Sequence, residues 1–398
     1  MMLGLAMNSD KSCGKYCYQS NFHHHYHYQL VACSCSGGFS VYNTNPFTRR
    51  MIKKGSGTSI IQMLNSTSLL ALVPSGDTAG SSPRKLMLWN SQTKETICEL
   101  PFPSTILAVR MNKNHLITVL DSNIHIFELS SMNNIHTLSA PTNCGLIDLT
   151  HNINENDGGR KSILAFKGMQ GGDIVLFDCI TLRVLGHIKA HKAPITALTF
   201  NSDATLFATA STKGTVVRVF SIPSAQHLMT FRRGSYSCTI NSLCFSPCSE
   251  YLSAGSSSGT VHIFSLENNK DNEKLPSPEK PKSSVFSISN ILPEPAQEFA
   301  ESTRAIIVTK IPNLDGEFIA SLIEGQGEKE MRDSKRSEQS TELLKLIVCT
   351  RNGYLYRFSI CKSLKNDNDK QPNKGGRYHY IMEDEYNIVA DFVDPSIK

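Results

Sequence analysis

Two adjacent arginines are the residues of this sequence best suited to bind an anion. Arg232 and Arg233 end an alternating segment that starts at Leu228 and stops at Gly234. Neighbouring side chains on a β-strand point to opposite faces, so the two arginines cannot serve one pocket. Arginine has a permanent charge and a planar set of donors that matches phosphate. The pair therefore predicts two phosphate pockets, one on each side of the strand.

Hydroxyl and imidazole side chains flank this strand in both directions along the chain and can complete each donor set. Those on the N-terminal side, which we group with Arg232, are His191, Ser211, Thr212 and Thr215, together with Arg218. Those on the C-terminal side, which we group with Arg233, are Ser257, Ser258, Thr260 and His262. Any one of them alone is more typical of a solvated hydroxyl or of a histidine bonded within its own sheet. Two adjacent arginines that point to opposite faces of the strand favour the phosphate-binding interpretation.

The arginine strand belongs to a repeat that recurs seven times. Each copy is a short alternating run that closes on an aromatic residue, usually after a Gly, Asn or Asp turn. The closing residues are Tyr42, Trp89, Phe127, Phe177, Phe220, Phe264 and Phe358. All spacings except the last lie near the ~40 to 45 residues of a WD40-type blade. The sequence therefore predicts an all-β fold, a seven-bladed WD40-like β-propeller, with the arginines on the last strand of the fifth blade and hence on the rim.

Two internal stretches interrupt the repeat. Residues 267–302, in the sixth blade, are rich in Asn, Lys, Glu and Pro, and residues 324–341 are dense in charge. Both are expected to be flexible loops. Tyr378 to Ile381 is expected to form a last outer strand and to close the ring by pairing near the N-terminus. The predicted division is a disordered extension (1–20), the propeller (21–385) and a tail (386–398).

The repeat region resembles the PROPPINs, which are seven-bladed propellers that bind phosphoinositides. The resemblance spans residues 21–360 and rests on Ala190–Lys192, Ala208–Thr215, Val217–Phe220, Phe231–Gly234 and Thr260–Phe264. It implies one rim pocket formed by His191, Ser211, Thr212, Thr215, Arg218 and Arg232. It implies a second formed by Arg233, Ser257, Ser258, Thr260 and His262. The implied ligands are phosphatidylinositol 3-phosphate and phosphatidylinositol 3,5-bisphosphate.

The 267–302 insertion is predicted to make a second membrane contact. Its apolar residues at helical spacing, which Pro293 follows, are Val285, Phe286, Ile288, Ile291 and Leu292. A helix of about ten residues is marginal in water but can form at a bilayer interface. The alternative is a linker whose apolar residues have no role. The resemblance favours insertion, because the corresponding PROPPIN loop enters membranes.

Other chemistries have weaker support. Cys13 and Cys17 lie near several histidines and near Cys33 and Cys35, and thiolates with imidazoles can bind zinc. The first two cysteines fall in the expected extension and the last two in the first blade, so we predict no metal site. The glycine-rich Gly55–Ser59 lacks the Lys of a P-loop. No nucleophile elbow or kinase signature is found, so we expect no enzymatic activity and no cofactor.

The composition limits the class of protein. The chain has 398 residues, of which 40% are hydrophobic and 19% charged, and its net charge is +5 at pH 7. This is enough apolar sequence for a large core, and the charge balance gives no support to nucleic-acid binding. No apolar run reaches the ~18 residues of a membrane span, and the apolar N-terminal stretch is too short for a secretion signal. We expect an intracellular protein with reduced cysteines.

The residues and the resemblance together predict a peripheral membrane protein that binds phosphoinositides and recruits autophagy machinery to forming autophagosomal membranes. Conjugation or lipid-transfer proteins are expected to bind at blades 2–3, where Arg110 and Lys113 lie, unless these are ordinary solvated charges. We expect a monomer at preautophagosomal, endosomal or vacuolar/lysosomal membranes. The main alternative is a protein-interaction propeller without lipid binding, because fold alone does not fix function.

Overall fold

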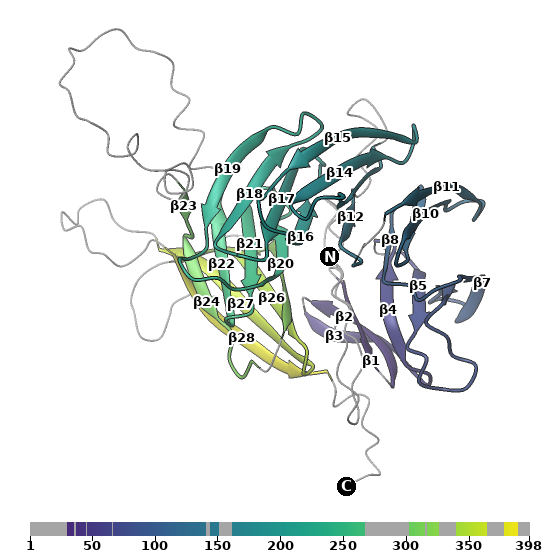
Figure 1. Cartoon of the computed structure of the whole chain (residues 1–398). Coiled ribbons are helices and arrows are strands. Elements are labelled where there is room, and N and C mark those ends of the chain that lie inside the picture. The colour runs from purple at the N-terminus through teal and green to yellow at the C-terminus, as the bar shows by residue number, and fades with distance from the viewer. Residues whose placement is uncertain are drawn as a thin grey trace, which may run out of the picture.

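Seven β-sheets are arranged in a ring, as the seven repeats predict (Figure 1). The computed structural model describes residues 30–35, 37–44, 46–65, 67–140, 144–150, 161–266, 302–314, 317–325, 340–363 and 378–388. Within these residues the secondary structure is all β, and no helix is long and apolar enough to cross a membrane. The expected all-β propeller is therefore confirmed.

Each blade is a sheet whose strands follow one another outwards from the axis. Blade 1 contains β1 (Leu30–Cys35), β2 (Gly38–Thr44) and β3 (Phe47–Lys54). Blade 2 contains β4 (Thr58–Met63), β5 (Leu69–Pro74), β6 (Lys85–Asn90) and β7 (Glu95–Pro101). Blade 3 contains β8 (Ala108–Met111), β9 (His115–Val119), β10 (Asn123–Glu128) and β11 (Asn134–Ser139). Blade 4 contains β12 (Ile147–Leu149), β13 (Ile163–Lys167), β14 (Asp173–Asp178) and β15 (Arg183–Lys189).

The remaining three blades carry the sites and the insertion. Blade 5 contains β16 (Ile195–Phe200), β17 (Leu206–Ser211), β18 (Val216–Ser221), β19 (His227–Arg232) and β23 (Thr303–Arg304). Blade 6 contains β20 (Ile240–Phe245), β21 (Tyr251–Ser256), β22 (Thr260–Ser265) and β24 (Ile307–Lys310). Blade 7 contains β25 (Phe318–Glu324), β26 (Ser340–Thr350), β27 (Tyr354–Ser363) and β28 (Tyr378–Asn387).

The aromatic residue that closes each repeat is buried between neighbouring blades. In blades 2 to 7 each lies on the third strand, and in blade 1 Tyr42 lies on β2. All seven are buried, with Phe127 the most exposed at 7%. Neighbouring sheets radiate from one axis, so the space between them widens outwards and takes a large side chain there. Burying such a ring removes much apolar surface from water, which is why the aromatic recurs.

Among the described residues, blades 7 and 1 meet by side-chain packing. β28 is the expected last outer strand and pairs with β27, and β1 pairs with β2. Residues 1–29 lie outside the described residues, so the expected pairing of this segment with one near the N-terminus stays a prediction. The two blades share an apolar cluster that includes Val31, Ile347 and Ile388.

The insertion of blade 6 joins β22 to β24, as the sequence predicts. Its described end holds a strand that was not expected. β23 lies parallel to β19, with Thr303 beside Phe231 and Arg304 beside Arg232. β19 is therefore not the last strand of blade 5, because β23 is added outside it (Figure 1).

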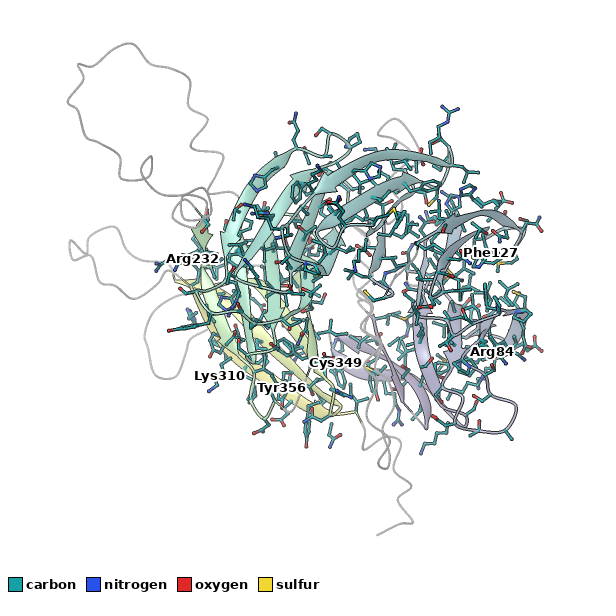
Figure 2. The ribbon with its side chains drawn as sticks, in the orientation of Figure 1. Arg84, Phe127, Arg232, Lys310, Cys349 and Tyr356 are labelled. Atoms are coloured by element: carbon teal, nitrogen blue, oxygen red, sulfur yellow. The ribbon has the colours of Figure 1, made fainter. Side chains whose placement is uncertain are left out.

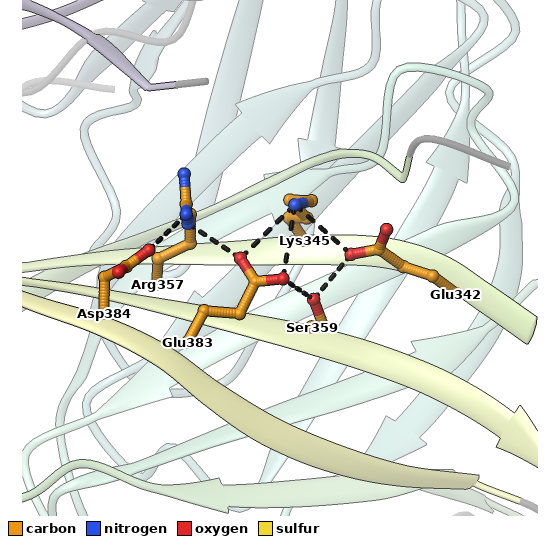
Figure 3. A network of polar contacts seen from close by, with 6 residues as sticks. All are labelled: Glu342, Lys345, Arg357, Ser359, Glu383 and Asp384. Carbon is orange, nitrogen blue, oxygen red and sulfur yellow. Dashed lines mark hydrogen bonds and ion pairs between the residues drawn. The ribbon is translucent and has the colours of Figure 1, made fainter. Parts of the chain in front are cut away.

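Blade 7 is stabilised by a network of charged side chains (Figure 3). Lys345 Nζ lies 3.5 Å from Glu342 Oε1 and 3.3 Å from Glu383 Oε2, and Arg357 Nε lies 2.7 Å from Glu383 Oε2. Arg357 also pairs with Asp384. Burial disfavours the ionised form of Glu383, but the Ser359 hydroxyl and the two cations outweigh it and lower the pKa of this carboxyl. The network joins β26, β27 and β28, since buried charges need partners.

The structure also bears on the predicted segment boundaries. β25 continues to Glu324 and β26 begins at Ser340, so the ends of the expected loop 324–341 are strand. β28 runs two residues past 385, to Asn387. The expected extension 1–20 and most of the segment 267–302 lie outside the described residues.

Candidate functional site

Arg232 ends β19 and Arg233 follows it directly, and the two side chains lie on opposite faces of blade 5. Phe231 packs towards blade 6, where its ring lies 4.9 Å from that of Phe264. Side chains alternate along a strand, so Arg232 faces blade 4 and Arg233 faces blade 6. The apolar clusters support this assignment of the two faces, because Phe220 of β18 packs with blade 4 and Val219 packs with blade 6. Arg232 and Lys310 lie on one side of the ring and Arg84 on the other (Figure 2).

The face of blade 5 towards blade 4 gathers the first group of predicted residues. Arg218 lies beside Thr209 in the register of β17 and β18, and its guanidinium donates to the Ala190 carbonyl. His191 Nε2 lies 3.0 Å from Thr209 Oγ1. Ser211 is buried on the same face of β17, two residues from Thr209. Arg232 lies at the end of β19 beside Val216 and donates to Ser235 Oγ at 2.9 Å. We call these residues the 4/5 cluster.

The turn that joins β17 to β18 carries the remaining residues of the 4/5 cluster. Thr212 is exposed, and its N–H donates to the Pro194 carbonyl at 2.8 Å. The carbonyl of Thr215 accepts from the N–H of Arg233 at 2.9 Å. Gly214 has φ +57°, and a Cβ there would lie 1.8 Å from the Cys238 carbonyl oxygen. Only glycine permits this close approach, which holds the turn beside both arginines.

The face of blade 6 towards blade 5 gathers the second group. Thr260 Oγ1 lies 3.2 Å from His262 Nε2 and 3.1 Å from Ser258 Oγ. Ser257 Oγ accepts from the N–H of Thr239 at 3.2 Å. Arg233 reaches this side with its Nε donating to the Gly214 carbonyl at 2.9 Å. We call Arg233, Ser257, Ser258, Thr260 and His262 the 5/6 cluster.

His262 is the titratable group of the 5/6 cluster. It is 9% exposed. Burial, with a smaller contribution from the charge of Arg233, lowers its pKa from the ordinary value to about 4. The imidazole is therefore neutral at pH 7 and can accept a hydrogen bond from one nitrogen while donating from the other.

Two functional candidates escaped the sequence prediction. Thr209 bonds His191 in the 4/5 cluster, and Ser256 Oγ lies 3.0 Å from Thr260 Oγ1 in the 5/6 cluster. Both are fully buried. Thr209 could have been found by strand alternation, because it lies two residues before Ser211 on the same face.

The predicted partner surface needs a correction. Arg110 is only 6% exposed, and its Nε lies 3.4 Å from Asp148 Oδ1. It is a buried ion-paired residue and neither a surface contact nor a solvated charge. Lys113, three residues on, is exposed.

The other predicted sites are only partly described. The five apolar residues of the insertion, Val285, Phe286, Ile288, Ile291 and Leu292, lie outside the described residues. Cys13 and Cys17 also lie outside them, and Cys33 is buried. The described part of the chain holds no cluster of three metal-ligating side chains. Burial raises the pKa of the Cys179 thiol to about 12, which makes it unreactive.

A protein-family model and several known proteins match this chain. A family model described as PROPPIN matches residues 53–360. The chain is similar to "Autophagy-related protein 18" of Yarrowia lipolytica, being 33% identical over 356 residues that cover 81% of this chain and 88% of that protein. The protein of the same name from Mycosarcoma maydis is 40% identical over 59% of this chain, but only 56% of its own length is covered.

Solved structures are similar over most of the chain. The structure titled "Kluyveromyces lactis Hsv2" has a TM-score of 0.65 at 18% identity and covers 90% of this chain and 95% of that one. The structure titled "Complex of KlAtg21 with coiled-coil of AgAtg16" has a TM-score of 0.58 at 25% identity and covers 84% and 94%. Both likenesses support the seven-bladed fold.

Proposed function

This chain belongs to the PROPPIN family, and from that premise we propose that it is a non-enzymatic, peripheral membrane effector of autophagy that binds phosphoinositides. The proposed ligands are phosphatidylinositol 3-phosphate and phosphatidylinositol 3,5-bisphosphate, one headgroup in each of the 4/5 and 5/6 clusters. The observation that carries the proposal is the opposite orientation of Arg232 and Arg233, each beside hydroxyl and imidazole groups of a different blade.

The chemistry of both clusters suits a phosphate. The guanidinium of Arg233 is held by two backbone carbonyls, those of Gly214 and Tyr236, which orient it without neutralising its charge. Around it lie hydroxyls, and neutral His262 can donate one N–H to a phosphate oxygen. The other cluster offers Arg218, Arg232 and His191.

Membrane recruitment follows from several weak contacts on one rim. A basic side chain near an anionic surface contributes ~1 kcal/mol, so one arginine does not retain the protein. Two occupied clusters, with the insertion of blade 6 as a third contact, make later contacts intramolecular, and avidity then exceeds either affinity by about 100-fold. Binding should therefore rise steeply with lipid density, at preautophagosomal, endosomal or vacuolar/lysosomal membranes.

A protein partner is expected on a different part of the ring. We propose that blades 2–3 bind a conjugation or lipid-transfer protein of autophagy and that Lys113 contributes, whereas buried Arg110 does not. A similar structure is titled as a complex with a coiled coil, which makes a helical partner reasonable.

Vesicle sedimentation tests the lipid proposal. Wild type should bind phosphatidylcholine vesicles that contain either phosphoinositide, and Arg232→Thr/Arg233→Thr should bind about 100-fold more weakly or not at all. Arg84→Thr, an exposed arginine across the ring, is the control and should bind as wild type does (Figure 2). Circular dichroism checks that each variant is folded. If wild type ignores both lipids, or the folded double variant binds equally well, the protein-interaction propeller replaces this proposal.

A further inference from the structure

The described end of the insertion crosses from blade 5 to blade 6. β23 pairs with β19 of blade 5, and β24 pairs with β22 of blade 6. Between them, Ala305 packs against the apolar cluster shared by blades 5 and 6, and the N–H of Ile306 donates to the Ile263 carbonyl at 2.8 Å. We call residues 303–310 the strap. It is fixed to both blades and lies at the rim between the two clusters.

The register of the strap brings one cation to each cluster. Arg304 is the partner of Arg232 in the parallel pair of β23 and β19, so both side chains lie on the face towards blade 4. Lys310 is the partner of Thr260 in the antiparallel pair of β24 and β22, so it lies on the face towards blade 5. The burial of Ile307 and Thr309 on the opposite face agrees with this orientation. Directly paired residues have Cβ atoms ~5 Å apart.

Neither cation has an ion-pair partner among the residues that the structure describes. Arg304 and Lys310 are both exposed. Arg304 lies beside a second arginine, so the pairing places two positive charges at one point of the rim, where a phosphate could accept from both. Lys310 similarly adds a charge to a cluster whose histidine is neutral at pH 7.

We infer that Arg304 is a ligand-binding residue of the 4/5 cluster and that Lys310 is one of the 5/6 cluster. The inference rests on the proposed function and extends it, because the strap that anchors the insertion then also completes both phosphate sites. Occupied sites would hold the strap to the rim, and the strap would hold the insertion towards the same membrane.

The test uses single variants in two backgrounds. Arg304→Ser and Lys310→Ser should each weaken binding to vesicles containing phosphatidylinositol 3-phosphate by about tenfold or more, the effect of losing one charge-assisted hydrogen bond to a phosphate. In the Arg232→Thr background, where binding depends on the 5/6 cluster, Lys310→Ser should weaken the remaining binding and Arg304→Ser should not. In the Arg233→Thr background, where binding depends on the 4/5 cluster, Arg304→Ser should weaken the remaining binding and Lys310→Ser should not. Arg84→Ser, on the far side of the ring, is the matched control (Figure 2).

Two further arms identify the source of the anion. Soluble inositol 1,3-bisphosphate should bind with the same dependence on Arg304 and Lys310, whereas inorganic phosphate alone should bind far more weakly. Vesicles of equal charge made with phosphatidylserine should not distinguish the strap variants from Arg84→Ser. Equal losses on phosphatidylserine vesicles would reduce the effect to general surface charge and overturn the inference.

The outcomes separate the two proposals. If wild type binds no phosphoinositide, the proposed function fails and the inference fails with it. If wild type binds but Arg304→Ser and Lys310→Ser behave as Arg84→Ser does, only the inference is overturned. Because both side chains are exposed, these variants should fold normally, which circular dichroism and the melting temperature can verify.

Discussion

At the residue scale, His262 links the 5/6 cluster to the stability of the protein. Its folded pKa is about 4, whereas an unfolded histidine titrates near ~6.5. Between these values the unfolded chain takes up a proton that the folded protein does not, so stability falls as the pH falls from about 6.5 to 4. Urea unfolding should show that wild type loses about 2 kcal/mol more than His262→Asn between pH 7 and 4.5.

The control for His262 is an exposed histidine on blade 4. His187→Asn, on β15, makes the same substitution at an exposed position outside both clusters and shows what the change of residue type does by itself. Equal losses of stability in wild type and His262→Asn would mean that His262 already binds a proton in the folded protein near pH 6, and the neutral donor assigned to it would then be wrong.

The face on which a side chain lies was predictable wherever strand alternation alone decides it. Alternation alone separates Arg232 from Arg233, and it groups Ser211 with the face that carries Arg218. It could not foresee that Arg110 is buried, because its partner Asp148 lies in the next blade, 38 residues along the chain. It could not find Arg304 either, since the register with β19 spans the whole insertion.

At the element scale, one carboxylate joins the inner strands of three blades. Asp148 of β12 has Oδ1 3.4 Å from Arg110 Nε of β8, and its Oδ2 accepts from the N–H of Phe200 of β16 at 2.9 Å. Asp148→Ala should destabilise the protein by about 3 kcal/mol, because it leaves a buried guanidinium without its partner. Chemical denaturation measures the change in unfolding free energy.

An exposed pair provides the comparison for Asp148. Lys85 and Glu99 lie 2.8 Å apart on neighbouring strands of blade 2, with about a third to a half of each side chain exposed. Glu99→Ala should cost less than about 1 kcal/mol. Similar costs for both variants would mean that water reaches Arg110 and that Asp148 does not couple the blades.

Strands and their order were the most predictable part of the fold. Most repeats combine a turn residue with a local alternation, and both signals lie within a few residues of each other. β23 has only two residues and no repeat of its own, so its place depends on blade 5 being already formed. The pairing expected to close the ring is likewise one between distant segments, which leaves no local signal.

At the scale of the whole molecule, the seam between blades 7 and 1 should be where the ring opens first. Successive blades are joined by the chain, whereas blades 7 and 1 are not consecutive along it. The described contacts across this seam are side-chain packing, including the Phe47 and Tyr386 rings at 3.8 Å between centroids. Tyr386→Ala should speed amide exchange of β1 to β3 and β28 about tenfold, since an aromatic contact contributes ~1 kcal/mol beyond its buried area. Hydrogen exchange with mass spectrometry resolves these strands separately.

The matching change away from the seam is Tyr380→Ala. Tyr380 lies on the same strand but is 39% exposed and contacts Phe358 of its own blade, so its loss should leave exchange in β1 to β3 unchanged. Blades 4 to 6, which carry both clusters, should exchange as in wild type in either variant. A uniform rise over all seven blades in Tyr386→Ala would mean that the ring unfolds as one cooperative unit, and that the seam is no weaker than the contacts between successive blades.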